Sequence, residues 1–326
     1  MEKNRNYGIY FFLLSIFFCV LFFYNSTSGL NLFGERISDA DAFLFIEFRL
    51  PKAITAVLVG AALSLSGLLL QSLFRNPLVG PYVLGVSSGA SLGVSVLIIG
   101  GGLFSISGFS IWSVSIASVL GAFTMLFIVL FFSGFLNGKV SLLLIGIMIG
   151  QLAGAFQAML DFLANPSELK SIFLWNMGSL ENVGWDKQIY LLITCLLLFL
   201  ISFFLVKPLD ALLLGEEYAT NLGVSVKQVR FLLIIVSGVL TAIVTSMCGP
   251  LAFVGIAVPH ICRMLFKTNR HVIILPAVLI CGSIFMLLAD LLSNSIMNFH
   301  IPINVVTSII GVPIVIGLIL KTRNLS

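Results

Sequence analysis

Side chains that commonly do chemistry are few in this sequence, and their spacing predicts no catalytic or metal-binding site. The three histidines are His260, His271 and His300, and no two of them lie three or four positions apart, as haem ligands on one helix face would. The five cysteines lie inside or at the ends of apolar runs, and none forms a C-x-x-C pair. Their odd number and apolar setting favour neither a disulfide framework nor a zinc site.

Nucleotide chemistry is not predicted for this chain either. The nearest approach to the phosphate-binding pattern G-x-x-x-x-G-K-[ST] is SGFLNGKV (133–140), which lacks the first glycine and the final hydroxyl side chain. Paired catalytic carboxylates are not apparent in the sequence. We therefore expect a protein that is not an enzyme and holds no cofactor. Any ATP and Mg²⁺ that it depends on would be bound by a separate subunit.

The elements that position these residues follow from a very apolar composition. Of the 326 residues, 59% are hydrophobic and 9% are charged, and the mean hydropathy is +1.15. Soluble domains are roughly 45–50% apolar and about 25% charged. A chain this poor in charge is expected to lie in a bilayer, where helices satisfy their own backbone hydrogen bonds. The formal net charge of +4 does not indicate a nucleic-acid partner.

Apolar runs long enough to cross a bilayer follow one another along the chain. A crossing helix needs about 20 mostly apolar residues, with roughly 17–25 tolerated. The first run exceeds the roughly 7–15 residues of a signal-peptide core, so we expect it to be retained. We predict one all-α membrane domain over residues 1–326, with ten helices at 7–24, 53–73, 83–99, 111–132, 140–160, 188–206, 231–247, 251–266, 272–290 and 303–320.

Basic residues between the predicted spans indicate the orientation of the chain. Cytoplasmic loops of membrane proteins are enriched in Lys and Arg. With a cytoplasmic N-terminus, twelve basic residues fall inside and five outside, the outer ones being Arg36, Arg49, Lys52, Lys170 and Lys187. We therefore expect a multi-pass membrane protein with both termini in the cytoplasm.

Interiors of the predicted helices are almost free of ionisable residues. No charged residue and no histidine stands between Leu84 and Ser133. Proton- or sodium-coupled carriers keep acidic residues or histidines inside the membrane for the coupling ion. An ion-coupled secondary carrier is therefore the less favoured alternative, and energy supplied by another subunit is favoured.

Such a subunit would need a docking surface on the cytoplasmic side. The segment KPLDALLLGEEYATNLGVSVKQVR (207–230) is the longest hydrophilic stretch there. Pro208 and Gly215 would bound one short helix, and EEYATNLGV would form a second, with Glu216 and Glu217 at its positive N-terminus. Two short helices across the inner face would make a docking surface.

Two interruptions bend the apolar runs. RNPLVGP (75–81) is predicted to be a tight inner turn, in which Pro77 and Pro81 end one helix and open the next. Gln71, one turn earlier, would bond either a neighbouring helix or a ligand. CGPLAFVGIAVPH (248–260) is predicted to be a broken or strongly bent segment. Irregular backbone at membrane depth needs shelter by protein or a water-filled path.

Five stretches of the chain together resemble the FecCD family of permeases. They occur in the order RLPKAITAVLVGAALSLSGLLLQSLFRNPLVGPYVLGVSSGASLG (49–93), WNMGSLENVGW (175–185), LLLGEEYATNLGV (212–224), GPLAFVGIAVPHICRML (249–265) and LADLLS (288–293). The resemblance runs from about residue 44 to 320. The family comprises the membrane subunits of type II ABC importers for ferric siderophores, haem and cobalamin.

The resemblance implies an architecture, partners and a class of cargo. It implies the ten-helix permease fold of that family, with helices 2–5 and 7–10 as an inverted repeat. It also implies a location in the bacterial inner membrane, a dimer of two permeases, two cytoplasmic ATPase subunits and an extracytoplasmic binding protein. The expected cargo is an iron chelate, either a ferric siderophore or haem, with cobalamin as the alternative.

Roles for individual residues follow from the same resemblance. Arg49 and Lys52 match two outward-facing basic residues that meet acidic residues of the binding protein. Residues expected to contact or couple to the ATPase are Gly215, Glu216, Ala219, Leu222, Gly223, His260 and Arg263. Candidate residues of the translocation pathway and its helix bends are Gln71, Asn76, Pro77, Gly85, Gly89, Gly249, Phe253, Gly255 and Pro259.

The sequence departs from the family pattern at the predicted docking surface. Many members place an arginine four residues after the aspartate of the helix-9 motif, where this chain has Asn294. The usual acidic ELP before the last helix is HIP (300–302) here. We therefore expect the contacts with the binding protein to differ in detail, with His300 as one substitute for the missing contact.

Overall fold

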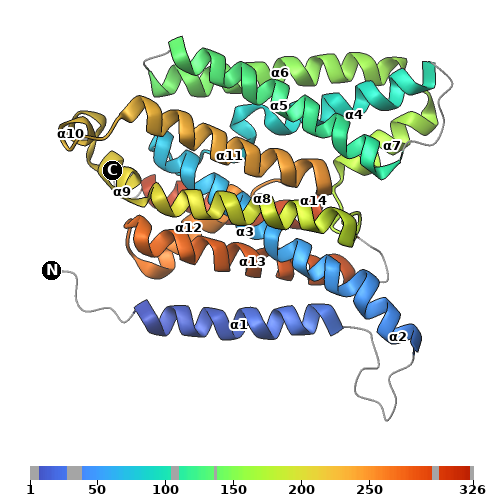
Figure 1. Ribbon diagram of the computed structural model, residues 1–326, viewed down its shortest axis with the longest axis horizontal. Coiled ribbons are helices and arrows are strands. Elements are labelled where there is room, and N and C mark those ends of the chain that lie inside the picture. The colour runs from blue at the N-terminus through green and yellow to red at the C-terminus, as the bar shows by residue number, and fades with distance from the viewer. Residues whose placement is uncertain (1–6, 28–38, 104–109, 136–137, 296–300, 324–326) are drawn as a thin grey trace.

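Every regular element in the described part of the chain is helical. A computed structural model describes residues 7–27, 39–103, 110–135, 138–295 and 301–323 (Figure 1). The elements are α1 (Tyr7–Thr27), α2 (Asp39–Leu44), η1 (Phe45–Arg49), α3 (Leu50–Phe74), η2 (Pro81–Leu84), α4 (Val86–Leu103), α5 (Ile111–Phe135), α6 (Lys139–Leu163), α7 (Pro166–Asn176), α8 (Trp185–Phe204), α9 (Val206–Leu214), α10 (Glu216–Asn221), α11 (Val226–Cys248), α12 (Val254–Phe266), α13 (His271–Ser295) and α14 (Ile303–Arg323).

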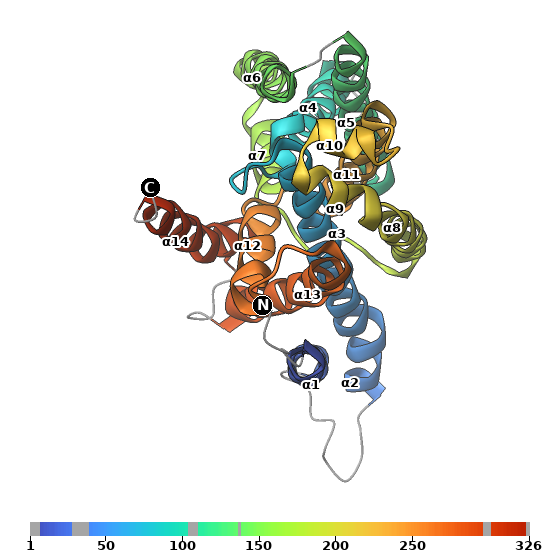
Figure 2. The ribbon, with the colours of Figure 1, turned by 90° about the vertical axis from the view of Figure 1, so that its left-hand side faces the viewer.

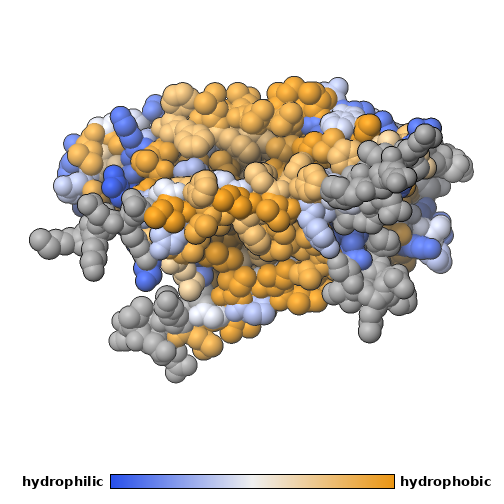
Figure 3. All heavy atoms as spheres, turned by 90° about the horizontal axis from the view of Figure 1, so that it is seen from below, coloured by the Kyte–Doolittle hydropathy of each residue, from blue (hydrophilic) through white to orange (hydrophobic). Residues whose placement is uncertain are grey.

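Each predicted span falls on one of these helices, and the all-helical membrane class is confirmed. Seven helices in the described residues are long and apolar enough to cross a membrane: α1, α3 with its N-terminal extension α2–η1, α5, α6, α8, α11 and α13. The remaining predicted spans correspond to α4, α12 and α14, which are shorter apolar helices. Apolar side chains cover the middle of the molecule, and polar ones gather at its two ends (Figure 3).

Helix α3 is the centre of the bundle. In its most apolar stretch 89% of the residues are buried, against 6% in α1, which lies at the edge (Figures 1 and 2). Helices α11, α12 and α13 all pack against it. One polar side chain of α3 bonds across this packing: the Ser66 hydroxyl donates to the Ser237 carbonyl of α11 at 2.9 Å.

Glycines let α3 approach two neighbours at backbone distance. A Cβ on Gly60 would overlap the carbonyl oxygen of Gly282 in α13, and a Cβ on Gly67 would overlap that of Gly255 in α12. In lipid there is little hydrophobic force between helices, so close packing of small residues stabilises their association. Gly60 and Gly67 therefore serve the packing of α3 against α13 and α12.

The two ends of the bundle differ in their secondary structure. One end carries α9 and α10, and α1 begins and α14 ends there (Figure 1). The other end carries α2 and α7 (Figure 1). Helix α7, which was not predicted, starts with a capping box in which the Glu168 carboxylate accepts from the Asn165 N–H at 2.9 Å.

Candidate functional site

The predicted pair of short helices, with the C-cap residue Leu222, forms the α9–α10 segment (residues 206–222). Gly215 separates the two helices with φ of 132°, a value that suits glycine and few other residues. The buried side chains of α9 include Leu209 and Leu212, whereas Leu214, Tyr218 and Leu222 are exposed. The segment is therefore anchored by one face and presents apolar side chains on the other. Of the residues predicted here, Ala219 is buried and supports this anchoring.

A partly buried chain of hydrogen bonds ties α9 to the bundle. Asp210 of α9 accepts from the His271 backbone N–H at 2.9 Å, and its carboxylate lies 2.7 Å from the His271 Nδ1. The other ring nitrogen, Nε2, lies 2.8 Å from the hydroxyl of Ser72 in α3. His271 begins α13, so one imidazole links α9, α13 and α3. We name this Asp210–His271–Ser72 set the α9 tether.

Two further contacts hold the same segment from other sides. The Arg75 guanidinium donates to the Leu213 carbonyl of α9 at 2.5 Å, which joins the end of α3 to the segment. Glu216 of α10 pairs with Arg230 of α11 at 3.2 Å. Glu216, predicted to contact an ATPase, is therefore engaged with its own chain. The α9–α10 segment is connected to α3, α11 and α13 by polar side chains.

The Gln71 side chain joins α3 to α12, and a neighbouring helix was one of the two partners predicted for it. Its amide Nε2 donates to the Gly255 carbonyl at 3.3 Å, and its Oε1 accepts from Arg263 at 2.6 Å. Gln71 thus bonds a neighbouring helix. Arg263 therefore reaches α3 beside the α9–α10 segment. His260, which was also expected near an ATPase, lies elsewhere and lines an apolar cavity of about 580 Å³ with residues of α12 and α14.

The segment between α11 and α12 is broken, as predicted. Residues 249–253 are non-helical, with Gly249 at φ 77° and Phe253, a non-glycine residue, at φ 65°. The Ala252 N–H donates to the Asn304 side chain at 3.1 Å, so α14 satisfies the freed backbone. Phe253 and Gly255 line a cavity of about 130 Å³ together with Pro81. Pro259 lies inside α12, one turn beyond the break.

The other predicted pathway residues are divided between turns and packing. Asn76 caps the turn after α3, since its Oδ1 accepts from the Leu78 N–H at 2.9 Å. Asn76 and Pro77 line a cavity beside the α9–α10 segment. Gly85 takes φ of 68° at the start of α4, and Gly89 packs against Gly121 of α5. These glycines are explained by backbone geometry and helix contact.

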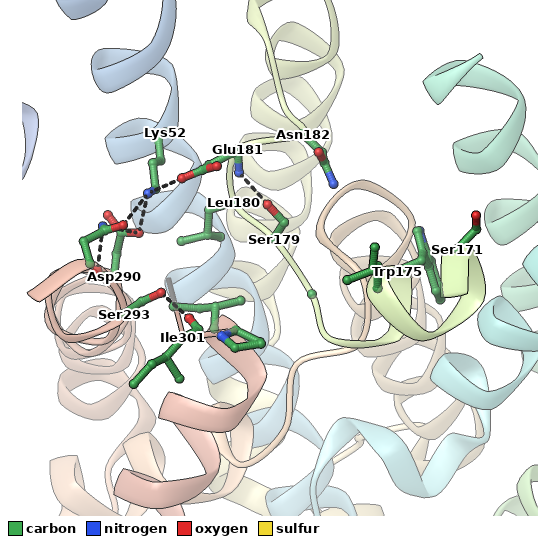
Figure 4. A pocket seen from close by; sticks show the side chains of 15 residues that line it. Lys52, Ser171, Trp175, Ser179, Leu180, Glu181, Asn182, Asp290, Ser293 and Ile301 are labelled. Atoms are coloured by element: carbon green, nitrogen blue, oxygen red, sulfur yellow. Dashed lines mark hydrogen bonds and ion pairs between the residues drawn. The ribbon is translucent and has the colours of Figure 1, made fainter. Parts of the chain in front are cut away.

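At the opposite end, Lys52 lies in a polar cluster with three partners (Figure 4). Its Nζ is 2.8 Å from Glu181, 3.1 Å from Asp290 and 3.3 Å from the Asn294 side-chain oxygen. The side chains of Lys52 and Asp290 are 10% and 4% exposed, whereas that of Glu181 is 62% exposed. We name these four residues the Lys52 cluster, which lines a cavity of about 420 Å³.

The two predicted docking residues, Lys52 and Arg49, lie in different surroundings. Lys52 neutralises carboxylates of its own chain, and Asn294, which departs from the family pattern, completes its hydrogen bonds. Arg49 is half-buried at the end of η1. His300, the suggested substitute contact, lies outside the described residues. Among the described residues, no three His, Cys, Asp or Glu side chains are placed to hold a metal ion.

Loss of the Lys52 charge is expected to destabilise the protein. Lys52→Met leaves the Asp290 carboxylate buried without its cation, and breaking such a pair costs about 3–5 kcal/mol. We expect a lower thermal unfolding midpoint in detergent, and recovery when Asp290→Leu is added. Lys170→Met, at an exposed position, is the matched control. Equal midpoints for Lys52→Met and Lys170→Met would contradict this assignment.

Comparisons with known proteins agree with the architecture and the motifs. The FecCD transport family matches residues 9–321. The chain is 36% identical over 291 residues to the molybdate import permease MolB of Haemophilus influenzae, covering 88% of this chain and 84% of MolB. It is 34% identical over 331 residues to the vitamin B12 import permease BtuC of Photorhabdus laumondii, covering 100% and 96% of the two chains.

One solved structure supports the same assignment at the level of the fold. An inward-facing transporter assigned to the metal-chelate type of ABC transporter superimposes with a TM-score of 0.86 at 33% identity, covering 95% of this chain and 98% of its own. Sequence family, curated relatives and fold therefore agree over nearly the whole length. This chain belongs to the FecCD transport family.

Proposed function

We propose that this chain is the permease subunit of a binding-protein-dependent ABC importer that moves an iron chelate inward. The observation that carries the proposal is the match of fold and sequence to a metal-chelate type ABC transporter over 95% of the chain. The tethered α9–α10 segment with its exposed apolar face supports it independently. The chain itself is a transport subunit, and ATP with Mg²⁺ binds to a separate cytoplasmic ATPase.

The proposed assembly contains two copies of this chain, two ATPase subunits and one binding protein. The end that carries α9 and α10 faces the cytoplasm, together with both termini. This orientation places Arg75, Lys207, Lys227, Arg263, Lys267 and Arg270 inside, in agreement with the enrichment of cytoplasmic loops in basic residues. The Lys52 cluster and Arg49 then face the binding protein.

The mechanism follows from the contacts of the α9–α10 segment. Closure of the ATPase subunits on ATP displaces this segment. The α9 tether, the Arg75–Leu213 contact and the Glu216–Arg230 pair carry the displacement to α13, α3 and α11. Because α3 packs at backbone distance against α12 and α13, these helices move together. Their movement switches the pathway between outward and inward access.

The cargo is proposed as an iron chelate, a ferric siderophore or haem. The matched transporter of the metal-chelate type supports this class. Cobalamin is the second candidate, because the vitamin B12 permease BtuC aligns with 100% of this chain. In either case the described helix interiors, poor in charge, suit a path with weak contacts that lets a large complex pass.

Proteoliposomes containing the permease, its ATPase and its binding protein test this function. We expect uptake of a radiolabelled ferric siderophore or haemin that requires ATP and all three components. Parallel vesicles receive cobalamin and molybdate, so the cargo is identified by which label accumulates. Uptake driven by a proton or sodium gradient without the ATPase would overturn the proposal in favour of an ion-coupled carrier.

Docking of the binding protein is proposed to involve Arg49. Arg49→Glu should slow capture of the loaded binding protein about ten-fold at low salt, because rim charges act mainly on the association rate. The difference from wild type should shrink at high salt, where the charges are screened. Association rates measured by surface plasmon resonance provide the readout. An unchanged rate at both salt concentrations would remove Arg49 from the docking surface.

The α9 tether is expected to set the efficiency of coupling. Asp210→Asn or His271→Gln weakens a hydrogen bond to a charged group, and such bonds contribute about 1.5–3 kcal/mol. We expect the amount of cargo moved per ATP hydrolysed to fall about ten-fold while hydrolysis continues. Ser66→Ala, which removes a buried α3–α11 hydrogen bond away from the segment, is the control. An unchanged cargo-to-ATP ratio in both tether variants would exclude this role.

A further inference from the structure

A basic cavity lies beside the α9–α10 segment. It measures about 330 Å³ and is bounded by the C-terminal end of α3 and by α9, α12 and α13, which adjoin one another at this end of the bundle (Figure 2). Two guanidinium groups line it, those of Arg75 and Arg263, together with the polar side chains of Ser72, Asn76, Asn269 and His271.

No aspartate or glutamate of the described residues lines this cavity. Arg75 donates to the Leu213 carbonyl at 2.5 Å and Arg263 to the Gln71 amide oxygen at 2.6 Å, so both recorded acceptors are neutral. Neither arginine forms an ion pair among the described residues. Asp210 contacts His271 at the cavity wall, where it accepts from the backbone N–H of that histidine, but it does not line the cavity itself.

Two guanidinium groups facing one cavity favour an anion. Each guanidinium has five N–H donors in a planar fork that fits a carboxylate or a phosphate. Like charges that share a partly buried site repel one another, and an anion placed between them removes this cost while forming charge-assisted hydrogen bonds. The amide groups of Asn76 and Asn269 add neutral donors to the same cavity.

We infer that this cavity receives the carboxylate of an acidic side chain from the ATPase subunit. The inference rests on the proposed function and names the chemistry of that contact. Leu214, Tyr218 and Leu222 are 66%, 56% and 59% exposed on the adjoining segment, so a subunit that covers them also covers the mouth of the cavity. Arg75 is bonded to the segment itself, which makes the charged and the apolar surfaces continuous.

The predicted partner surface is therefore an apolar cleft with an aspartate or glutamate at its edge. The apolar cleft covers the exposed face of α9–α10, and the acidic residue enters between Arg75 and Arg263. A phospholipid phosphate has similar chemistry. The ATPase is favoured because one wall of the cavity is the α9–α10 segment and another is the C-terminal end of α3, the central helix.

Affinity measurements on the detergent-solubilised permease and its purified ATPase test the inference. Arg75→Gln and Arg263→Gln should each weaken ATPase binding about ten-fold and reduce its dependence on salt, because a charge pair is lost. Arg75→Lys should restore part of the affinity. Arg270→Gln removes the same charge from an exposed position at this end that does not line the cavity, and it should change the affinity less than about two-fold.

The outcomes separate this inference from the proposed function. If the wild-type permease binds no ATPase, the proposed function fails. If wild type binds and the Arg75 and Arg263 variants behave like Arg270→Gln, the cavity inference is overturned. Native mass spectrometry tests the lipid alternative. If a phospholipid is lost only from those two variants while their ATPase affinity is unchanged, the cavity is a lipid site and the inference is overturned. Arg263→Gln also removes the hydrogen bond to Gln71 and could lower the thermal unfolding midpoint. In that case Arg75→Gln, which leaves this bond in place, decides the test.

Discussion

The close approach of α3 to α12 and α13 is the constraint on which the rest of the structure depends. Gly60 and Gly67 of α3 meet Gly282 and Gly255 at backbone distance, where any side chain would overlap a carbonyl oxygen. Helices in lipid gain little from the hydrophobic effect when they associate, so van der Waals packing of small residues takes its place. These contacts hold α3 in the centre, where both ends of the bundle are organised around it.

The polar residues are arranged as connectors at the ends of this apolar bundle. At one end Lys52 joins α3 to α13 through Asp290 and to the loop before α8 through Glu181. At the other end His271, Arg75 and Arg230 join the α9–α10 segment to three long helices. A buried charge is costly without a partner, so the Lys52–Asp290 pair fixes the relative position of α3 and α13. The two ends are connected to each other through α3 and α13.

This arrangement suits a permease that is driven from outside the membrane. In the proposed mechanism, a force applied to the α9–α10 segment would reach α3 through side chains that are bonded on both sides, and α3 would carry α12 and α13 with it. The break at residues 249–253 comes directly before α12, and its Ala252 N–H donates to the side chain of Asn304 in α14. The break leaves backbone groups without helical partners, and one of them, the Ala252 N–H, finds its partner in another helix.

Much of this could be predicted from the sequence, because the relevant signals are local. Apolar runs of bilayer length predicted the spans, Gly215 and the prolines predicted the two short helices and the turn after α3, and the polar amide of Gln71 predicted a bond between helices. The five motifs between residues 49 and 293, taken together and in order, pointed to the family. Only the tertiary structure decided which residues that are distant in the sequence pair with each other. Asp210 and His271 are 61 positions apart, Ser72 and His271 are 199 apart, and Lys52 and Glu181 are 129 apart. No local pattern encodes which helices become neighbours, so the sequence presented Lys52 as an outward-facing cation and gave no role to His271, whereas the packing around α3 placed both in buried polar contacts.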